Sequence, residues 1–311
     1  MRVLVAGGAG FIGATMCARL LERGDEVTCV DNLVTGSIDN VKYLLDRIGM
    51  SFVEADVSVG VPVEGTFDAV VNLACPASPA DFGPLALEIL DVGSRGVANL
   101  LELAQRHGAR FLQASTSEVY GEPLVHPQPE SYWGNVNPLG PRSMYDEAKR
   151  FGEALTMAYQ RKFGLEVRIA RIFNTYGPRM RADDGRMVSN FVNQALRGEP
   201  LTVHGDGSQT RSFCYVDDEV TGLLALLDSS VTGPVNVGSD DERTVLDVAQ
   251  LVLDLCGSTS GIIFIDRPTD DPSQRRPDLT IARRELGWEP ATPLREGLAR
   301  TIKWFKDRIE E

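Results

Sequence analysis

The sequence predicts an α/β protein built on a doubly wound parallel sheet with a smaller C-terminal lobe. Short apolar runs rich in β-branched residues alternate with helical patterns through the first half of the chain. A glycine-rich turn links the first apolar run to the first helical pattern, and polar residues follow several later runs. Ligands of such sheets bind beyond the carboxyl ends of the strands, so these polar residues are the first candidates for a site.

Composition limits the classes of protein to which the chain can belong. Its 311 residues, 43% of them hydrophobic, suffice for one large or two closely packed domains. A formal net charge of −13 argues against a nucleic-acid partner. Five cysteines without a CxxC pair, and the lack of an apolar stretch of membrane-spanning length, favour a cytoplasmic protein outside the membrane. The three scattered histidines form no zinc pattern, and we expect no metal.

The N-terminal segment has the pattern of a dinucleotide-binding strand, turn and helix. The apolar run Arg2–Ala6 leads into the turn Gly7-Gly8-Ala9-Gly10-Phe11-Ile12-Gly13 and then a helical pattern. Glycines let the backbone approach a pyrophosphate, which the free N–H groups of a helix N-terminus attract. A second strand, Glu26–Val30, ends at Asp31, whose carboxylate suits ribose hydroxyls and repels a 2′-phosphate. No basic residue follows before Lys42, so the sequence favours NAD over NADP.

The next strand ends supply further polar residues. We expect strands at 51–55, 69–74 and 110–114, and one long helix over 85–105. The segments after these strands, which should face the ligand crevice, are Asp56-Val57, Asn72-Leu73-Ala74-Cys75 and Ser115-Thr116-Ser117-Glu118-Val119-Tyr120-Gly121.

A tyrosine and a lysine one helical turn apart are the strongest candidates for chemistry. Tyr145 and Lys149 share a helix face, because residues four apart are neighbours on a helix. A nearby cation favours the phenolate, and a phenolate can deprotonate a sugar hydroxyl. Five prolines interrupt the preceding segment 122–142, which therefore predicts a long loop leading into this helix.

The second half of the chain departs from strict alternation after a sixth strand at 165–171. We expect helices at 188–197, 218–227, 245–256, 279–286 and 294–308, and strands at 213–216, 235–238 and 262–265. The predicted domains are therefore interleaved in the chain. One, with the cofactor site, comprises residues 1–174 with 213–240, and the other comprises 175–212 with 241–311.

At the level of motifs the chain resembles the extended short-chain dehydrogenase/reductase superfamily, and within it the UDP-glucuronic acid decarboxylase (UDP-xylose synthase) family. The glycine turn and the Tyr145/Lys149 pair match the superfamily, and the likeness runs from Arg2 to about Trp304. The narrower match rests on segments 72–79, 116–121, 125–128, 132–138, 185–191 and 207–213. Three residues differ from the usual family pattern, Cys75 for serine, Gly93 for asparagine and His204 for tyrosine.

The resemblance implies a Rossmann sheet with a nucleotide-sugar lobe and an enzyme that uses bound NAD. It implies C4 oxidation of UDP-glucuronate, decarboxylation of the resulting β-keto acid, and reduction to UDP-xylose. The implied catalytic residues are Thr116, Ser117, Glu118, Tyr145, Lys149 and Arg275, with Arg276 as the competing arginine. The expected cofactor residues are Gly7, Gly10, Phe11, Ile12, Gly13, Asp31, Asn32, Asp56, Val57, Leu73, Ala74, Tyr145 and Lys149. The expected substrate residues are Asn174, Val188, Phe191, His204, Arg211 and Arg275.

Rival functions stay open at this stage. An NDP-sugar 4,6-dehydratase shares the first oxidation, but that family places aspartate where this chain has Ser117. A UDP-sugar 4-epimerase typically lacks a glutamate at the position of Glu118. A catalytically silent NAD-sensing module would not need Thr116, Tyr145 and Lys149 together. The resemblance also implies a homodimer, paired through the helices near 85–105 and 145–163.

Overall fold

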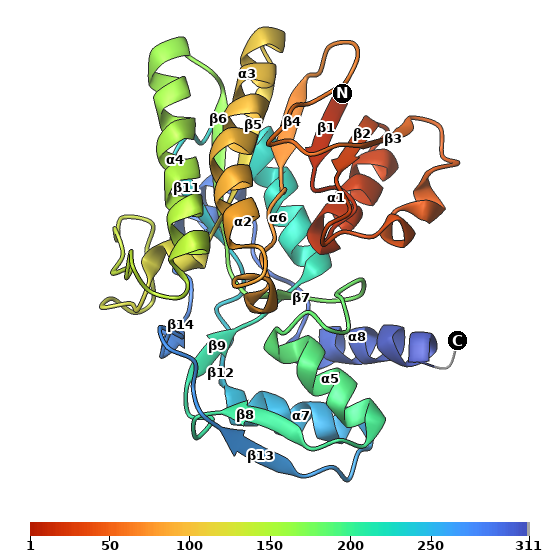
Figure 1. The fold of residues 1–311 in the computed structure, drawn as a ribbon, viewed down its shortest axis with the longest axis vertical. Coiled ribbons are helices and arrows are strands. Elements are labelled where there is room, and N and C mark those ends of the chain that lie inside the picture. Colours follow the sequence, from red (N-terminus) through yellow and green to blue (C-terminus); the bar gives the residue numbers. More distant parts are fainter. Residues whose placement is uncertain (310–311) are drawn as a thin grey trace.

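The computed structural model describes residues 1–309 and is organised around one parallel sheet (Figure 1). The sheet has seven strands in the order β11-β6-β5-β4-β1-β2-β3, which confirms the predicted doubly wound α/β class. Its strands are β1 (Arg2–Ala6), β2 (Glu26–Asp31), β3 (Met50–Glu54), β4 (Ala69–Asn72), β5 (Arg110–Thr116), β6 (Val167–Ile172) and β11 (Pro234–Val237). The chain reverses its direction of travel along the sheet between β1 and β4, and this switch is where a crevice opens.

Alternating side chains of the strands pack against helices on the two faces of the sheet. Val3 and Val5 of β1 belong to the core that includes α1 (Phe11–Glu22) and α6 (Val216–Asp228). Leu4 and Ala6 point to the other face, where α3 (Val97–His107) contributes five of the buried side chains. Because both faces are covered, the central strands β1 and β4 are apolar on both faces from Val3 to Ala6 and from Ala69 to Val71.

The expectation of one continuous helix over 85–105 is wrong in detail. The segment forms α2 (Ala86–Asp91), a π-helical turn at Val92–Gly96, and then α3. Gly93 in this turn packs against α4 (Ser143–Phe163): a Cβ at Gly93 would lie 2.5 Å from the Cβ of Ala148. The interruption therefore coincides with the place where the helix carrying Tyr145 and Lys149 approaches most closely.

The C-terminal lobe is built from short strands and three helices. The helices are α5 (Met187–Arg197), α7 (Val245–Cys256) and α8 (Leu294–Ile309). Strand β8 (Leu201–His204) pairs with β13 (Ile262–Ile265), and β9 (Thr210–Ser212) lies between β12 (Glu242–Thr244) and β14 (Gln274–Arg275). Below the main sheet in Figure 1, this lobe faces the carboxyl ends of its strands.

Several expected boundaries in the second half need correction. The strand expected at 213–216 is only β10 (Cys214–Tyr215), which pairs with β7 (Thr175–Tyr176), because Val216 already begins α6. The helix expected at 279–286 includes a π-helical turn at Ala282–Leu286. Within residues 1–309, no helix combines the length and apolar character needed to cross a bilayer.

The contact between Gly93 and Ala148 predicts an unusual response to substitution. Replacing a helical glycine with alanine ordinarily stabilises a helix by up to about 1 kcal/mol. Here Gly93→Ala should instead lower the free energy of unfolding by about 1–3 kcal/mol, because the new methyl group overpacks against Ala148. Adding Ala148→Gly should restore part of the loss. Denaturant unfolding measures both effects.

Gly83 provides the matched control, because a Cβ there would meet no atom within 4 Å. Gly83→Ala should leave the midpoint of unfolding nearly unchanged. A Gly93→Ala protein that is more stable than the parent would contradict the close approach of the two helices.

Candidate active site

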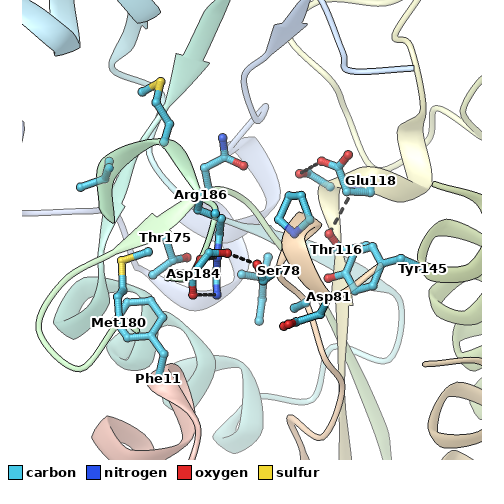
Figure 2. A pocket seen from close by; sticks show the side chains of 18 of the residues that line it. Phe11, Ser78, Asp81, Thr116, Glu118, Tyr145, Thr175, Met180, Asp184 and Arg186 are labelled. Carbon is cyan, nitrogen blue, oxygen red and sulfur yellow. Dashed lines mark hydrogen bonds and ion pairs between the residues drawn. The ribbon is translucent and has the colours of Figure 1, made fainter. Parts of the chain in front are cut away.

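A single cavity of about 390 Å³ brings most of the predicted site residues together. It lies where β1, β4, β5 and β6 end and is closed on the other side by residues of the C-terminal lobe (Figure 2). The predicted residues that line it are Gly7, Gly10, Phe11, Ile12, Gly13, Leu73, Thr116, Ser117, Glu118, Tyr145, Lys149, Asn174, Val188, Phe191, His204 and Arg211. The predicted residues outside its lining are Asp31, Asn32, Asp56, Val57, Ala74 and Arg275.

The glycine turn forms a backbone cradle at one end of the cavity. Gly7 has a φ of +75°, and a Cβ there would lie 2.7 Å from the backbone of Leu73 and Ala74. A Cβ at Gly13 would lie 2.0 Å from the carbonyl oxygen of Gly7. Helix α1 begins at Phe11 without a side-chain cap, so its first N–H groups remain available. This geometry fits the pyrophosphate of a dinucleotide.

Asp31 fixes the shape of the turn beside this cradle. Its carboxylate accepts hydrogen bonds from the backbone N–H groups of Ala9 (3.0 Å) and Leu33 (2.9 Å). Burial raises the pKa of Asp31, and these two hydrogen bonds oppose that rise. Each carboxylate oxygen still has a free lone pair for a ribose hydroxyl. Nearby, Asn32 donates to the carboxylate of Asp56 at 3.2 Å, so these two predicted residues lie side by side.

Tyr145 and Thr116 both line the cavity and lie side by side, as Figure 2 shows. Burial raises the pKa of Tyr145, the charges of Cys75 and Glu118 raise it further, and a hydrogen bond with Thr116 lowers it. Lys149 donates to the carbonyl oxygen of Ala114 at 3.0 Å, and its Nζ lies 5.7 Å from the centre of the Tyr145 ring. Lys149 therefore lies close to the Tyr145 ring, and burial is the largest influence on the pKa of Tyr145.

Glu118 lies among arginines beside this pair. Arg142 donates to it at 2.6 Å, and an Nη atom of Arg275 lies 3.4 Å from its other oxygen. Burial raises the pKa of Glu118, but the charges of Arg275, Arg142 and Arg211 outweigh it and lower the pKa to about 2. The carboxylate is consequently ionised at neutral pH.

The two candidate arginines of the lobe occupy different places. Arg275 is 1% exposed, and within the described chain its Nε, Nη1 and Nη2 atoms make no hydrogen bond. It sits behind Glu118 and does not line the cavity. The side chain of Arg276 is 38% exposed and lies 3.9 Å from Glu242. Of the two, Arg275 is the one that faces the candidate catalytic residues.

The substrate end of the cavity is formed by the lobe. Arg211 on β9 donates to the carboxylate of Asp271 at 3.0 Å and to its neighbour's carbonyl oxygen, Thr210, at 2.8 Å. Burial lowers the pKa of Arg211, and the charge of Asp271 opposes that change. The predicted residues around this end of the cavity are Asn174, Val188, Phe191 and His204.

Sequence reasoning missed three residues at this site. Arg142 lines the cavity and pairs with Glu118, and Phe82 lines it and stacks on Tyr145 with ring centres 5.0 Å apart. Asp146 is buried next to Tyr145, and burial together with the charge of Glu118 raises its pKa to about 7. Arg142 had a detectable signal, a basic residue three positions before Tyr145. Phe82 had none, because its segment is remote in sequence.

Comparison with known proteins agrees with this geometry. Residues 3–238 match the NAD dependent epimerase/dehydratase family. UDP-glucuronic acid decarboxylase 5 of Arabidopsis thaliana is 50% identical over 310 residues, covering 99% of this chain and 90% of the relative. UDP-glucuronic acid decarboxylase 1 of Danio rerio is 49% identical over 309 residues, covering 99% of this chain and 73% of the relative.

A solved structure extends the likeness to the whole fold. The dTDP-glucose 4,6-dehydratase DesIV from Streptomyces venezuelae, solved with NAD bound, is 30% identical, with a TM-score of 0.89 over 100% of this chain and 98% of its own. The cradle, the Tyr145/Thr116 pair and the sequence matches lead to one conclusion. The chain belongs to the NAD dependent epimerase/dehydratase family, where relatives about half identical over nearly its full length are UDP-glucuronic acid decarboxylases.

Proposed function

We propose that this protein converts UDP-glucuronic acid to UDP-xylose and carbon dioxide, using NAD that is regenerated in each cycle. The observation that carries the proposal is the placement of two chemical centres in one cavity. Tyr145 and Thr116 form one centre, and Glu118 with its arginines forms the other. Half-identical relatives with this named activity supply the substrate class.

The first centre is assigned to oxidation and reduction at C4. Tyr145 acts as the phenolate and takes the proton of the 4-hydroxyl, and Thr116 holds the same oxygen by a hydrogen bond. When bound, NAD would supply a reversible hydride acceptor, and the positive charge of its nicotinamide would favour that phenolate. The high pKa that burial gives Tyr145 suits the second half of the cycle, because the phenol keeps the proton until the ketone is reduced. We assign Lys149 to the nicotinamide ribose.

The second centre is assigned to decarboxylation and protonation at C5. Oxidation at C4 makes the substrate a β-keto acid, so the electrons of the breaking C5–C6 bond delocalise onto the C4 oxygen beside Thr116. Glu118 is ionised, with a pKa of about 2, and has no proton to give to C5. We therefore assign Glu118 and Ser117 to orienting the water that supplies this proton. Arg275 neutralises Glu118 from behind.

The binding assignments follow the two ends of the cavity. We assign the diphosphate of the substrate to Arg211, since a guanidinium fork suits phosphate oxygens. We assign the uridine of the substrate to Asn174, Val188, Phe191 and His204. We assign the pyrophosphate of NAD to the glycine turn and its ribose to Asp31. We propose the domain division 1–174 with 213–240 and 175–212 with 241–311, because the lobe then supplies the substrate end.

A homodimer in the cytoplasm completes the proposal. Leu87 and Leu90 on α2 and Phe151 on α4 are 75%, 40% and 49% exposed, on the two helices expected to pair. An apolar face of this kind is typical of an interface. The five cysteines are free thiols, which suits a reducing compartment.

The rival activities make different use of the same cavity. A 4,6-dehydratase eliminates the 6-hydroxyl with an acid beside the glutamate, a position that Ser117 occupies here. A 4-epimerase must return hydride to the opposite face and keeps C6. Product NMR with UDP-glucuronate separates the three activities, because only decarboxylation loses C6.

The first prediction concerns the cofactor. Purified protein should retain NAD in part and should bind NAD more tightly than NADP, because the buried carboxylate of Asp31 repels a 2′-phosphate. Asp31→Asn should reduce the difference in affinity between NAD and NADP. Binding titrations with both dinucleotides measure it, and a parent protein that prefers NADP would rule out the role of Asp31.

The second prediction separates the two centres. Tyr145→Phe should abolish both NADH formation and carbon dioxide release. Glu118→Gln should still form NADH from bound NAD while carbon dioxide release slows by a factor on the order of 10²–10⁴. Rapid-mixing absorbance with carbon dioxide trapping distinguishes the variants. Equal loss of both signals in a Glu118→Gln protein that keeps the circular dichroism of the parent would refute the assignment.

The third prediction tests the dimer. Phe151→Glu combined with Leu87→Glu should shift light scattering at micromolar concentration from dimer to monomer, because two charges would be buried in an apolar interface. Ile48→Glu is the control, since Ile48 is fully exposed on a different part of the surface. A parent protein that is already monomeric would contradict the proposed pairing.

A further inference from the structure

Phe82 contacts both chemical centres although the mechanism above gives it no role. Its ring stacks on the ring of Tyr145, with centres 5.0 Å apart and planes inclined by 21°. The guanidinium carbon of Arg142 lies 5.4 Å from the centre of the same ring. Arg142 in turn donates to Glu118 at 2.6 Å. One buried aromatic side chain, 5% exposed, therefore connects the hydroxyl base to the Glu118 ion pair.

Hydrogen bonds to Arg181 and Asp184 hold the segment that carries Phe82. Ser78 donates to the carbonyl oxygen of Asp184, and one Nη atom of Arg181 donates to both carboxylate oxygens of Asp81 at 3.0 and 3.1 Å. Figure 2 shows Ser78 and Asp184 side by side, joined by this hydrogen bond. Residues 179–181 and 184–186 also line the cavity, so the position of Phe82 depends on cavity-lining residues far away in the sequence.

The stack has two physical effects on Tyr145. It fixes the plane of the phenol, because stacked aromatic pairs favour defined offsets and add about 0.5–1.5 kcal/mol beyond burial. It also covers the ring and keeps water from it, and burial is the largest cause of the raised pKa of Tyr145. The ring of Phe82 also contacts Arg142, and the quadrupole of an aromatic ring attracts a cation placed over it. Arg142 is thereby oriented toward Glu118.

We propose that Phe82 is a positioning residue for the reaction. It holds Tyr145 and Arg142 against one ring and so fixes the position of one centre relative to the other. This proposal rests on the proposed function for its kinetic consequences. The stack itself exists in the free protein and can be tested without substrate.

The first test is spectroscopic. In protein labelled with ¹³C-tyrosine, the ring signals of Tyr145 are identified by their loss in Tyr145→Phe. Phe82→Leu should shift these signals, because the ring current of Phe82 is removed, whereas Phe82→Tyr should shift them much less. Unchanged Tyr145 signals in a folded Phe82→Leu protein would overturn the stack whether or not UDP-glucuronate is the substrate.

The second test is kinetic and uses UDP-glucuronate. Phe82→Leu should lower kcat by about 10-fold with a smaller change in KM, because a misplaced reacting group costs rate rather than affinity. The acid limb of the kcat profile should move to lower pH, since water reaching Tyr145 relieves the burial that raises its pKa. Phe82→Tyr should keep both kcat and the pH of the acid limb near the parent values.

Phe213→Leu is the matched control. Phe213 also lines the cavity and is 8% exposed, but its aromatic contact is with Tyr176 rather than Tyr145. The Phe213→Leu variant should keep the acid limb of the kcat profile at the pH of the parent. An equal shift in Phe213→Leu, or a Phe82→Leu profile that matches the parent, would overturn the positioning role. If the parent releases no carbon dioxide from UDP-glucuronate, the proposed function fails and the ¹³C test still decides the stack.

Discussion

The ionised side chain of Glu118 is only 14% exposed, and the arrangement of charges around it follows from that constraint. A buried charge needs a close partner, because desolvation costs several kcal/mol per ion. Arg142 supplies one partner from the start of α4, and Arg275 supplies the other from β14 in the lobe. The ion pairs therefore join the sheet to the lobe at the cavity itself. Removing the carboxylate would leave two arginines uncompensated.

The same charges explain the protonation states nearby. Glu118 repels negative charge on Asp146 and Tyr145, and burial adds to the effect for both. Asp146 consequently has a pKa of about 7, and the pKa of Tyr145 lies above its ordinary value. The sequence pattern of a tyrosine four residues before a lysine placed the two side chains on one face but gave no information on their electrostatics. Those depend on Ala114, Cys75 and Glu118, which approach only in the folded chain.

The sequence predicted the features that depend on local pattern. The strands of the main sheet are nearly as expected, because long β-branched runs between helical patterns have a clear periodicity. Strands β8, β9, β12 and β14 were missed, since segments of two to four residues are held by pairing with distant partners. Gly93, in the π-helical turn within 85–105, lies against Ala148, a contact that crosses more than 50 residues. Phe82 was missed for the same reason, because its partner Tyr145 lies more than 60 residues away in the chain.

The net charge and the cavity have opposite signs, and together they favour a small anion over a polymeric one. The chain carries −13 overall, yet Arg142, Arg186 and Arg211 line the cavity. A long polyanion would meet the acidic surface along most of its length, whereas a nucleotide sugar presents all its charge inside the cavity. Before it binds, Arg211 is paired with Asp271 at 3.0 Å. A diphosphate must compete with that carboxylate, so the site discriminates by charge: a dianion can displace Asp271 from the guanidinium where a neutral sugar cannot.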